Sequence, residues 1–258
     1  FNVRDVFEHQ TPAALASIAR TETVTKQAVV VDEQGVVPLL PVYHQFLAQG
    51  TELRRFHQTL RLRVPKGLTQ GQALKMLVKL VAHHGSLRLR TQPDTSPLGT
   101  QFVIDPPAIA QTLNLPVINV STLPQAEQTL AIDQAFEQLS DRLAPDTTGG
   151  MIAPLWVERG ASQPALLLLV IHHFAIDGVS WRIVLEDLNA LVQKSNQALA
   201  PTTLKLRDWG KWLHEQGALG ARRKEELFWS AQTHGAQALP TDSRFNEQDN
   251  TVSAANTV

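Results

Sequence analysis

Leu166-Leu167-Leu168-Leu169-Val170-Ile171 runs directly into His172-His173-Phe174-Ala175-Ile176-Asp177-Gly178, and this stretch says more about the fold than any other. The apolar part lacks the alternation of a half-exposed strand, so it predicts a strand in the middle of a sheet that is covered on both faces. Helical spacing follows from Val179 to Asn196, with an apolar stripe at Ile183, Val184, Leu188, Leu191 and Val192. The polar motif therefore lies on a loop between a buried strand and a helix, where rigid scaffolds often carry functional groups.

The motif offers proton-transfer chemistry. If the backbone is still extended at His172 and His173, their side chains point to opposite faces, and one can face a cavity while the other packs. An imidazole titrates near physiological pH and can accept or donate a proton. Asp177 can cap the next helix or pair with an arginine, and Gly178 permits a positive φ or a close approach of another chain. The motif is therefore a candidate active site in which one of the two histidines transfers a proton.

Other interpretations of the motif stay open. A histidine beside a strand is often a satisfied core or surface residue, although two histidines with an aspartate and a glycine at one junction favour a function. A metal site is a further alternative, but adjacent histidines rarely converge on one ion and Asp177 is the only nearby carboxylate. His172 and Asp177 also fit the short His-x4-Asp pattern of glycerolipid acyltransferases.

Composition limits the classes of protein. The chain has 258 residues, of which 43% are hydrophobic and 18% charged, a balance typical of a soluble globular protein. A net charge of -1 gives no support to nucleic-acid binding. The chain has no cysteine, which excludes disulfides and thiolate chemistry and fits a cytosolic protein. The longest apolar run, Ala165 to Ile171, is too short to span a membrane.

Further periodic segments surround the motif. We expect helices at 11–19 (with Thr11 as a cap and Pro12 in the first turn), 42–49, 69–84, 129–143, 222–230 and around Trp209 and Trp212. We expect strands at 56–64, 87–90, 101–104 and 155–157. Residues 21–36 read as a linker with one β-like run, Ala28 to Val31, and residues 235–250 as loop.

Several chemically distinctive residues have structural interpretations. His83 and His84 end a predicted helix, where cationic side chains suit the helix dipole. Arg88 and Arg90 alternate with leucines, either on a solvated face or with one of them buried and paired with Asp177. Trp209, Trp212 and Trp229 are most simply packing residues.

The sequence from His172 to Trp181, HHFAIDGVSW, matches the HHxxxDGxSW signature of the condensation-domain superfamily of nonribosomal peptide synthetases. Its continuation, Val179 to Leu188, is most similar to the epimerization branch, in which VSWRILLEDL is typical. Three more stretches resemble family motifs: Pro38-Leu39-Leu40-Pro41 to Phe46, His83 to Arg90, and Asn250 to Ala255. The fold implied is α/β, an α+β sandwich in which a chloramphenicol-acetyltransferase-like lobe with a mixed central sheet is followed by the start of a second similar lobe.

The resemblance also implies a domain order. Residues 1–20 resemble the C-terminal helix of a peptidyl carrier protein, whose phosphopantetheine-bearing serine would lie upstream of Phe1. Residues 21–36 are then the linker, 37–200 the N-terminal lobe, and 201–258 the beginning of a truncated C-terminal lobe. The chain starts without an initiator Met and ends in a β-prone segment, so we expect it to be incomplete and inactive by itself.

The activity implied is inversion of the α-carbon of an aminoacyl or peptidyl thioester held on the 4′-phosphopantetheine of a carrier protein. His173 is implied as one acid/base group and a glutamate beyond Val258 as the other. His172 is expected to pack, Gly178 to leave room for the pantetheine arm, and Asp177 to orient the loop through an arginine, first of all Arg88; Ser180 and Trp181 complete the motif. The implied partners are the carrier protein and other synthetase modules, without metal, nucleic acid or membrane.

Two related functions remain as alternatives. In a condensation domain, His173 would assist attack of an acceptor amine on a donor thioester, and the continuation from Val179 to Leu188 argues against this. An inactive module of the same family would only bind carrier proteins, and the intact His173 argues against that.

Overall fold

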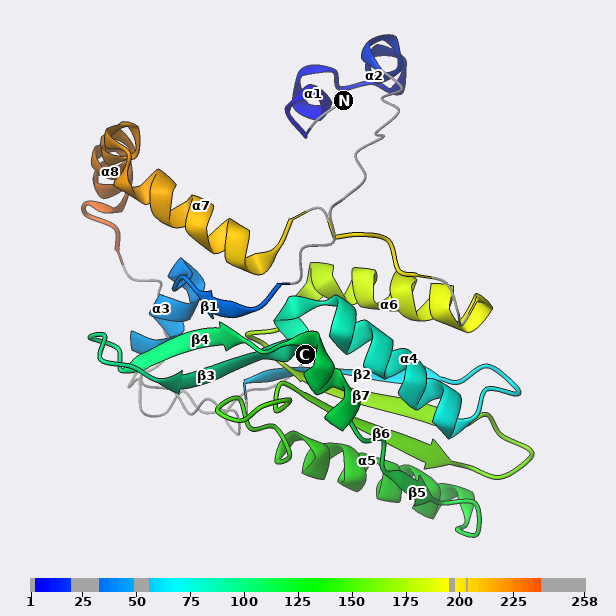
Figure 1. The fold of residues 1–258 in the computed structure, drawn as a ribbon. Coiled ribbons are helices and arrows are strands. Elements are labelled where there is room, and N and C mark those ends of the chain that lie inside the picture. Colours follow the sequence, from blue (N-terminus) through cyan, green and yellow to red (C-terminus); the bar gives the residue numbers. More distant parts are fainter. Residues whose placement is uncertain (1–2, 20–32, 49–55, 195–197, 203, 238–258) are drawn as a thin grey trace.

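The computed structural model describes residues 3–19, 33–48, 56–194, 198–202 and 204–237 (Figure 1). Its elements, in chain order, are α1 (Val3–Glu8), α2 (Pro12–Ile18), β1 (Gly35–Val37), α3 (Pro41–Ala48), β2 (His57–Arg63), α4 (Gln70–His83), the 3₁₀ turn η2 (Gly85–Arg88), β3 (Leu89–Pro93), β4 (Thr100–Ile104), η3 (Pro107–Thr112), β5 (Val117–Asn119), α5 (Gln125–Ser140), β6 (Ile152–Glu158), β7 (Leu166–His172), α6 (Gly178–Gln193), α7 (Leu206–Ala218) and α8 (Gly220–Thr233). This is a mixed α/β protein, as the sequence predicts.

The larger sheet has four strands in the order β2-β7-β6-β5. β7 is antiparallel to both of its neighbours, whereas β5 is parallel to β6, so the sheet is mixed. The second sheet has three antiparallel strands in the order β1-β4-β3. The prediction of an inner strand at 166–171 is confirmed, since β7 lies between two strands and all its residues are buried.

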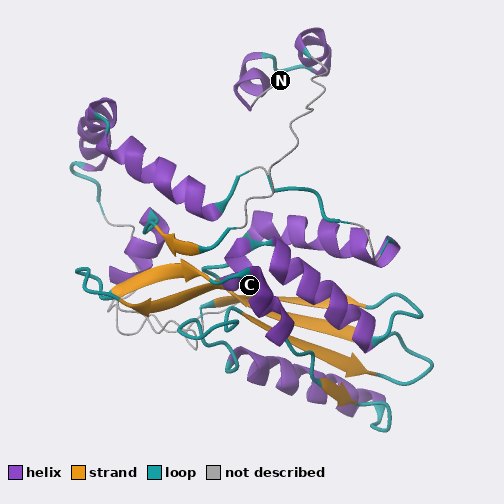
Figure 2. Ribbon diagram, viewed as in Figure 1, coloured by secondary structure: helices purple, strands orange, loops and turns teal. Residues whose placement is uncertain are grey.

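β7 is covered on both faces by helices. Leu167, Leu169 and Ile171 belong to one buried cluster, which also contains residues of α4 and α6, and Leu166, Leu168 and Val170 belong to a second cluster with residues of α5. Figure 2 shows α4 and α6 on one side of the four-stranded sheet and α5 on the other. The strand is apolar throughout because successive side chains enter different cores.

Helix starts follow the local sequence. Thr69 forms a reciprocal capping box with Gln72 at the start of α4, which satisfies two backbone N–H groups that a helix leaves free. Thr11 caps α2 by accepting from Ala14 N, and Pro12 lies in the first turn, both as expected. The predicted α3 is also confirmed, and the predicted α5 begins four residues earlier, at Gln125.

Some expectations about individual residues are wrong. Leu87 and Arg88 lie in the 3₁₀ turn η2, so the strand begins only at Leu89. Ile183 is 47% exposed and lies outside the buried stripe of α6, which consists of Val184, Leu188 and Leu191. Ile183 lies at the edge of the apolar stripe around the helix axis. A residue in that position is buried only if a neighbouring helix or strand covers that edge of the helix.

Of the three tryptophans predicted to be packing residues, two pack on each other, and they do so at the surface. Trp209 and Trp212 on α7 stack on each other with ring centroids 4.8 Å apart, and both remain partly exposed. Trp229 on α8 is 62% exposed. They are not core residues of the part of the chain that the structure describes.

One of the expected domain boundaries can be compared with the positions of the strands. β1 begins at Gly35 and pairs with β4, so the expected boundary between residues 36 and 37 falls inside a strand. α7 also contacts β1, and Arg207 N donates to Glu33 Oε1 at 2.8 Å. The β-like run 28–31 and most of the loop expected at 235–250 lie outside the described residues. Among the helices described, none has the length and apolar character needed to cross a membrane.

Candidate active site

The motif begins where β7 leaves the sheet. His172 is the last residue of the strand, lies opposite His57 of β2, and is fully buried. His173 follows it, is half-buried, and donates its backbone N–H to Phe56 O at 2.8 Å. The expected division is confirmed: His172 packs, and His173 is the more accessible histidine.

The ring of His173 is held on three sides. Phe56 stacks on its face with centroids 4.7 Å apart and an interplanar angle of 22°. Its Nδ1 lies 2.8 Å from Ile176 O, and its Nε2 lies 3.0 Å from Gln58 Nε2. Gln58 Oε1 in turn accepts from Trp181 Nε1 at 2.8 Å.

These contacts define the tautomer of His173. The Ile176 carbonyl can only accept, so Nδ1 of His173 carries the proton. The indole of Trp181 can only donate, so the oxygen of the Gln58 amide faces it and the NH₂ group faces His173. Nε2 of His173 therefore accepts a hydrogen bond and carries a lone pair. Two separate contacts thus place the proton on Nδ1 and the lone pair on Nε2, which is the arrangement that a general base needs.

The loop after His173 is fastened to the core. The hydroxyl of Tyr43 donates to Phe174 O at 2.6 Å, and Phe174 N donates to Nδ1 of His172 at 3.2 Å. Burial, with a smaller contribution from the charge of Asp177, raises the pKa of Tyr43 well above its usual value, so this hydroxyl stays protonated and keeps donating. Phe174 also packs edge-on against Tyr43 and Phe102. A base on such a loop is positioned by a rigid scaffold.

Asp177 is the N-cap of α6. Its Oδ1 accepts from Ser180 Oγ and from Ser180 N, each at 2.7 Å. The capping alternative is thus confirmed. Gly178 follows as the first residue of α6; it is not among the residues with positive φ, and an added Cβ would meet nothing within 4 Å. Gly178 therefore does not adopt the positive φ that a glycine permits. The space beside its Cα is open, as the second expectation for this residue requires.

The cap makes the stability of the protein depend on pH. Hydrogen bonds from the Ser180 hydroxyl and amide, with a minor contribution from His173, hold the pKa of Asp177 below its ordinary value of 3.8. A carboxylate with a lowered pKa stabilises the fold above its unfolded-state pKa, and this contribution is lost as the pH falls through the folded-state value. We expect the difference in unfolding free energy between wild type and Asp177→Asn to be constant at neutral pH and to shrink below 3.8.

Urea unfolding of both proteins across this range measures the difference, and Asp177→Ala should cost about 1 kcal/mol at neutral pH through loss of the cap. The matched control is Asp146→Asn, at an exposed aspartate outside the motif. A difference between wild type and Asp177→Asn that stays constant into strong acid would contradict the role of Asp177 as a charged cap.

The expected pairing of Arg88 with Asp177 is wrong. Arg88 is 1% exposed and donates to the backbone oxygen of Asp105, while Asp177 is exposed and bonds Ser180. Arg90 Nε bonds Asp105 Oδ1 at 2.9 Å. Arg88 in η2 and Arg90 on β3 therefore both bond Asp105, the residue after β4, because a guanidinium that is removed from water needs acceptors close by.

Gln58 is the site residue that sequence reasoning missed. It lies on β2 opposite Ile171, so its side chain shares a face of the sheet with Ile171, and position 173 is its diagonal neighbour. The proximity of Gln58 to His173 becomes visible only from the register of β2 on β7. Gln58 and Trp181 also line a hollow of about 530 Å³, together with His57, Thr59, Phe136, Glu137 and Ser140.

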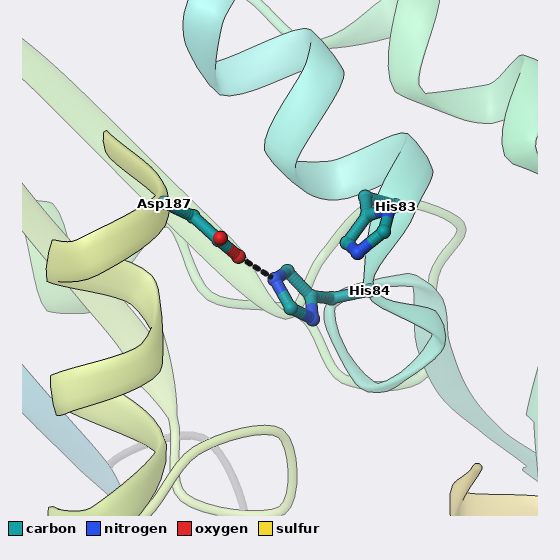
Figure 3. Close-up of side chains that lie close together, drawn as sticks. All are labelled: His83, His84 and Asp187. Carbon is teal, nitrogen blue, oxygen red and sulfur yellow. Dashed lines mark hydrogen bonds and ion pairs between the residues drawn. The ribbon is translucent and has the colours of Figure 1, made fainter. Parts of the chain in front are cut away.

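A second polar cluster joins α4 to α6. Figure 3 shows His83, His84 and Asp187, whose potential ligand atoms lie within 4.8 Å of one another. His84 Nε2 already bonds Asp187 Oδ2 at 2.7 Å. Burial lowers the pKa of His84, and the hydrogen bond that its ring donates to Asp187 opposes this shift. A direct histidine–aspartate hydrogen bond between two packed helices supports the structural interpretation of this pair. His172, His173 and Asp177 form no such group among the described residues.

The fold and the motif define a family, and comparison with known sequences agrees. The family model described as "Condensation domain" matches residues 33–258, so the chain belongs to the condensation-domain family. It is 30% identical over 258 residues to a linear gramicidin synthase of Brevibacillus parabrevis, covering 96% of this chain and 3% of that protein. It is 32% identical over 250 residues to a chondramide synthase of Chondromyces crocatus, covering 93% of this chain and 6% of that protein. The chain thus spans only a small part of these relatives.

Solved structures share the fold. The epimerization domain from the third module of tyrocidine synthetase B superimposes with a TM-score of 0.71 at 19% identity, covering 84% of this chain and 49% of that one. The starter condensation domain of rhizomide synthetase superimposes with a TM-score of 0.67 at 12% identity, covering 82% and 48%. At these identities the likeness shows the fold alone. The match to the carrier helix expected at 1–20 lies outside the residues that the family model covers and stays a prediction.

Proposed function

We propose that this chain is part of an epimerization domain, which inverts the α-carbon of an aminoacyl or peptidyl thioester carried on the 4′-phosphopantetheine of a peptidyl carrier protein. The observation that carries the proposal is the pair of contacts at the ring of His173: Nδ1 lies 2.8 Å from Ile176 O, and Nε2 lies 3.0 Å from the amide nitrogen of Gln58, an arrangement that leaves a lone pair on Nε2. A thioester carbonyl makes the neighbouring α C–H more acidic than an amide carbonyl would, and a positioned base can remove this proton when the resulting enolate is stabilised.

The proposed reaction has two proton transfers. Nε2 of His173 takes the α-proton on one face of the carbon, which leaves an enolate of the thioester. A second acid then returns a proton to the other face; by the family resemblance this acid is a glutamate of the second lobe. Open space beside Gly178, at the start of α6, supports access of the pantetheine arm to this end of β7.

The choice of epimerization over condensation rests on residues 179–188. Their sequence, VSWRIVLEDL, resembles the VSWRILLEDL typical of the epimerization branch, and this resemblance supports the choice. Trp181, which belongs to this segment, also has a structural role, because its indole N–H donates to Gln58 Oε1 and orients the Gln58 amide. Structural neighbours of both kinds exist, so the fold favours neither.

The test uses the complete domain with its own carrier protein, loaded with an aminoacyl group that is deuterated at the α-carbon. An epimerization domain should wash the deuterium out into solvent and give a mixture of L and D residues without any acceptor. A condensation domain should retain the deuterium and form a peptide only when an acceptor carrier is supplied. Retention of deuterium with peptide formation overturns the proposal; retention with neither product supports an inactive carrier-binding module.

A further inference from the structure

Three side chains from separate parts of the chain form one hydrogen-bonded row beside the candidate base. Trp181 lies on the first turn of α6, Gln58 on β2 and His173 on the loop after β7. The row is Trp181 Nε1–H to Gln58 Oε1 at 2.8 Å and Gln58 Nε2–H to His173 Nε2 at 3.0 Å. All three residues are half-buried, so water can compete with these bonds unless their geometry is maintained by packing.

The orientation of the Gln58 amide decides what it can do to His173. With its oxygen toward His173, the amide would stabilise a proton on Nε2 and so remove the lone pair of the base. With its NH₂ group toward His173, it stabilises the lone pair. An amide alone has no strong preference between the two orientations, but the indole of Trp181 is only a donor and therefore fixes the oxygen on its own side.

We propose that Gln58 is a positioning residue, oriented by Trp181, that holds His173 in the Nδ1–H tautomer with its Nε2 lone pair ready for the substrate proton. In a reaction the substrate replaces the Gln58 N–H at Nε2, while Ile176 O keeps its bond to Nδ1–H. The role of Gln58 in proton transfer rests on the proposed function. Its control of the His173 tautomer does not depend on that function.

The position of Gln58 follows from the sheet and not from the motif. Gln58 and His173 are 115 residues apart, and the pairing of Gln58 with Ile171 puts both side chains at the same end of β7. The ring of Phe56, two residues before Gln58, stacks on the same imidazole. Phe56, just before β2, thus supplies the face contact and Gln58 on β2 supplies the hydrogen-bond donor, while the motif supplies the imidazole and the carbonyl.

The sharpest test is Gln58→Glu, which keeps the shape of the side chain and the acceptor for Trp181 but replaces the NH₂ donor by a carboxylate oxygen. ¹⁵N–¹H spectra of the 258-residue chain with labelled histidine distinguish the two tautomers. Wild type should show His173 as the Nδ1–H form, and Gln58→Glu should add a proton to Nε2. The indole signal of Trp181 should persist in the variant, which shows that the fold is intact.

Two further variants complete the test. Trp181→Phe removes the indole donor, so the amide can rotate, and both tautomers of His173 should appear. Gln134→Glu makes the same chemical change at an exposed position of α5 and should leave the His173 signals as in wild type. An unchanged Nδ1–H form in both Gln58→Glu and Trp181→Phe overturns the proposal.

Activity provides a second measurement. In the complete domain, Gln58→Glu should lower the turnover number for α-proton exchange by a factor on the order of 100 and leave the KM for the loaded carrier unchanged, because only the alignment of the base is lost. Normal turnover together with a switched tautomer would overturn the positioning role. If wild type itself exchanges no α-proton, the proposed function fails, while the spectra still decide whether Gln58 sets the tautomer.

Discussion

His173→Ala in the complete domain should lower the rate of α-deuterium washout from a loaded carrier protein by a factor of about 10²–10⁴, the usual contribution of a positioned general base. The substitution removes the Nε2 lone pair of His173 and leaves Gln58 and Trp181 bonded to each other. The fold should survive because His173 is half-buried and its backbone bond to Phe56 O does not depend on the side chain.

The matched control is His44→Ala, which removes an exposed histidine from α3 and should leave the washout rate at the wild-type value. The two variants should show the same urea midpoint within experimental error, so that a loss of rate cannot be a loss of fold. Full washout by His173→Ala would exclude His173 as the base and with it the proposed mechanism.

The largest loss of stability is expected from Leu169→Ala. Leu169 is fully buried in β7 and belongs to the cluster that α4 and α6 cover. Truncation of a fully buried leucine removes its transfer free energy and leaves a cavity, which together cost about 2–5 kcal/mol. The neighbouring side chains cannot collapse into the cavity easily, because strands pair with β7 on both sides. Urea unfolding should show the loss as a lower midpoint with an unchanged slope.

Leu130→Ala on α5 is the control for this experiment. Its leucine is 59% exposed, so the same change should alter the unfolding free energy by no more than about 0.5 kcal/mol. Leu169→Met conserves volume and should cost less than about 1.5 kcal/mol. If Leu169→Ala cost as little as Leu130→Ala, β7 would not be the covered central strand described above.

Local features of the chain were predictable because local forces create them. The unbroken apolar run 166–171 identifies a strand buried on both faces, and the Thr69 cap and the stripe of α6 follow from helix geometry. Asp177 as a cap was one of two options, and the tertiary structure selects it because Arg88 is occupied at Asp105. The exposure of Ile183 and of the tryptophans depends on whether other helices or strands pack against them. A local sequence pattern does not show which elements those are.

The amino-acid sequence alone is enough to predict the motif, the strand and helix on either side of it, and the family to which the chain belongs. Which of the two histidines is accessible, and which nitrogen of His173 keeps its lone pair, depends on the tertiary structure. The physical reason is the range of the interactions. Strand periodicity and caps act within a few residues, whereas the amide that faces His173 comes from Gln58, 115 residues away, and is brought there by the register of β2 on β7.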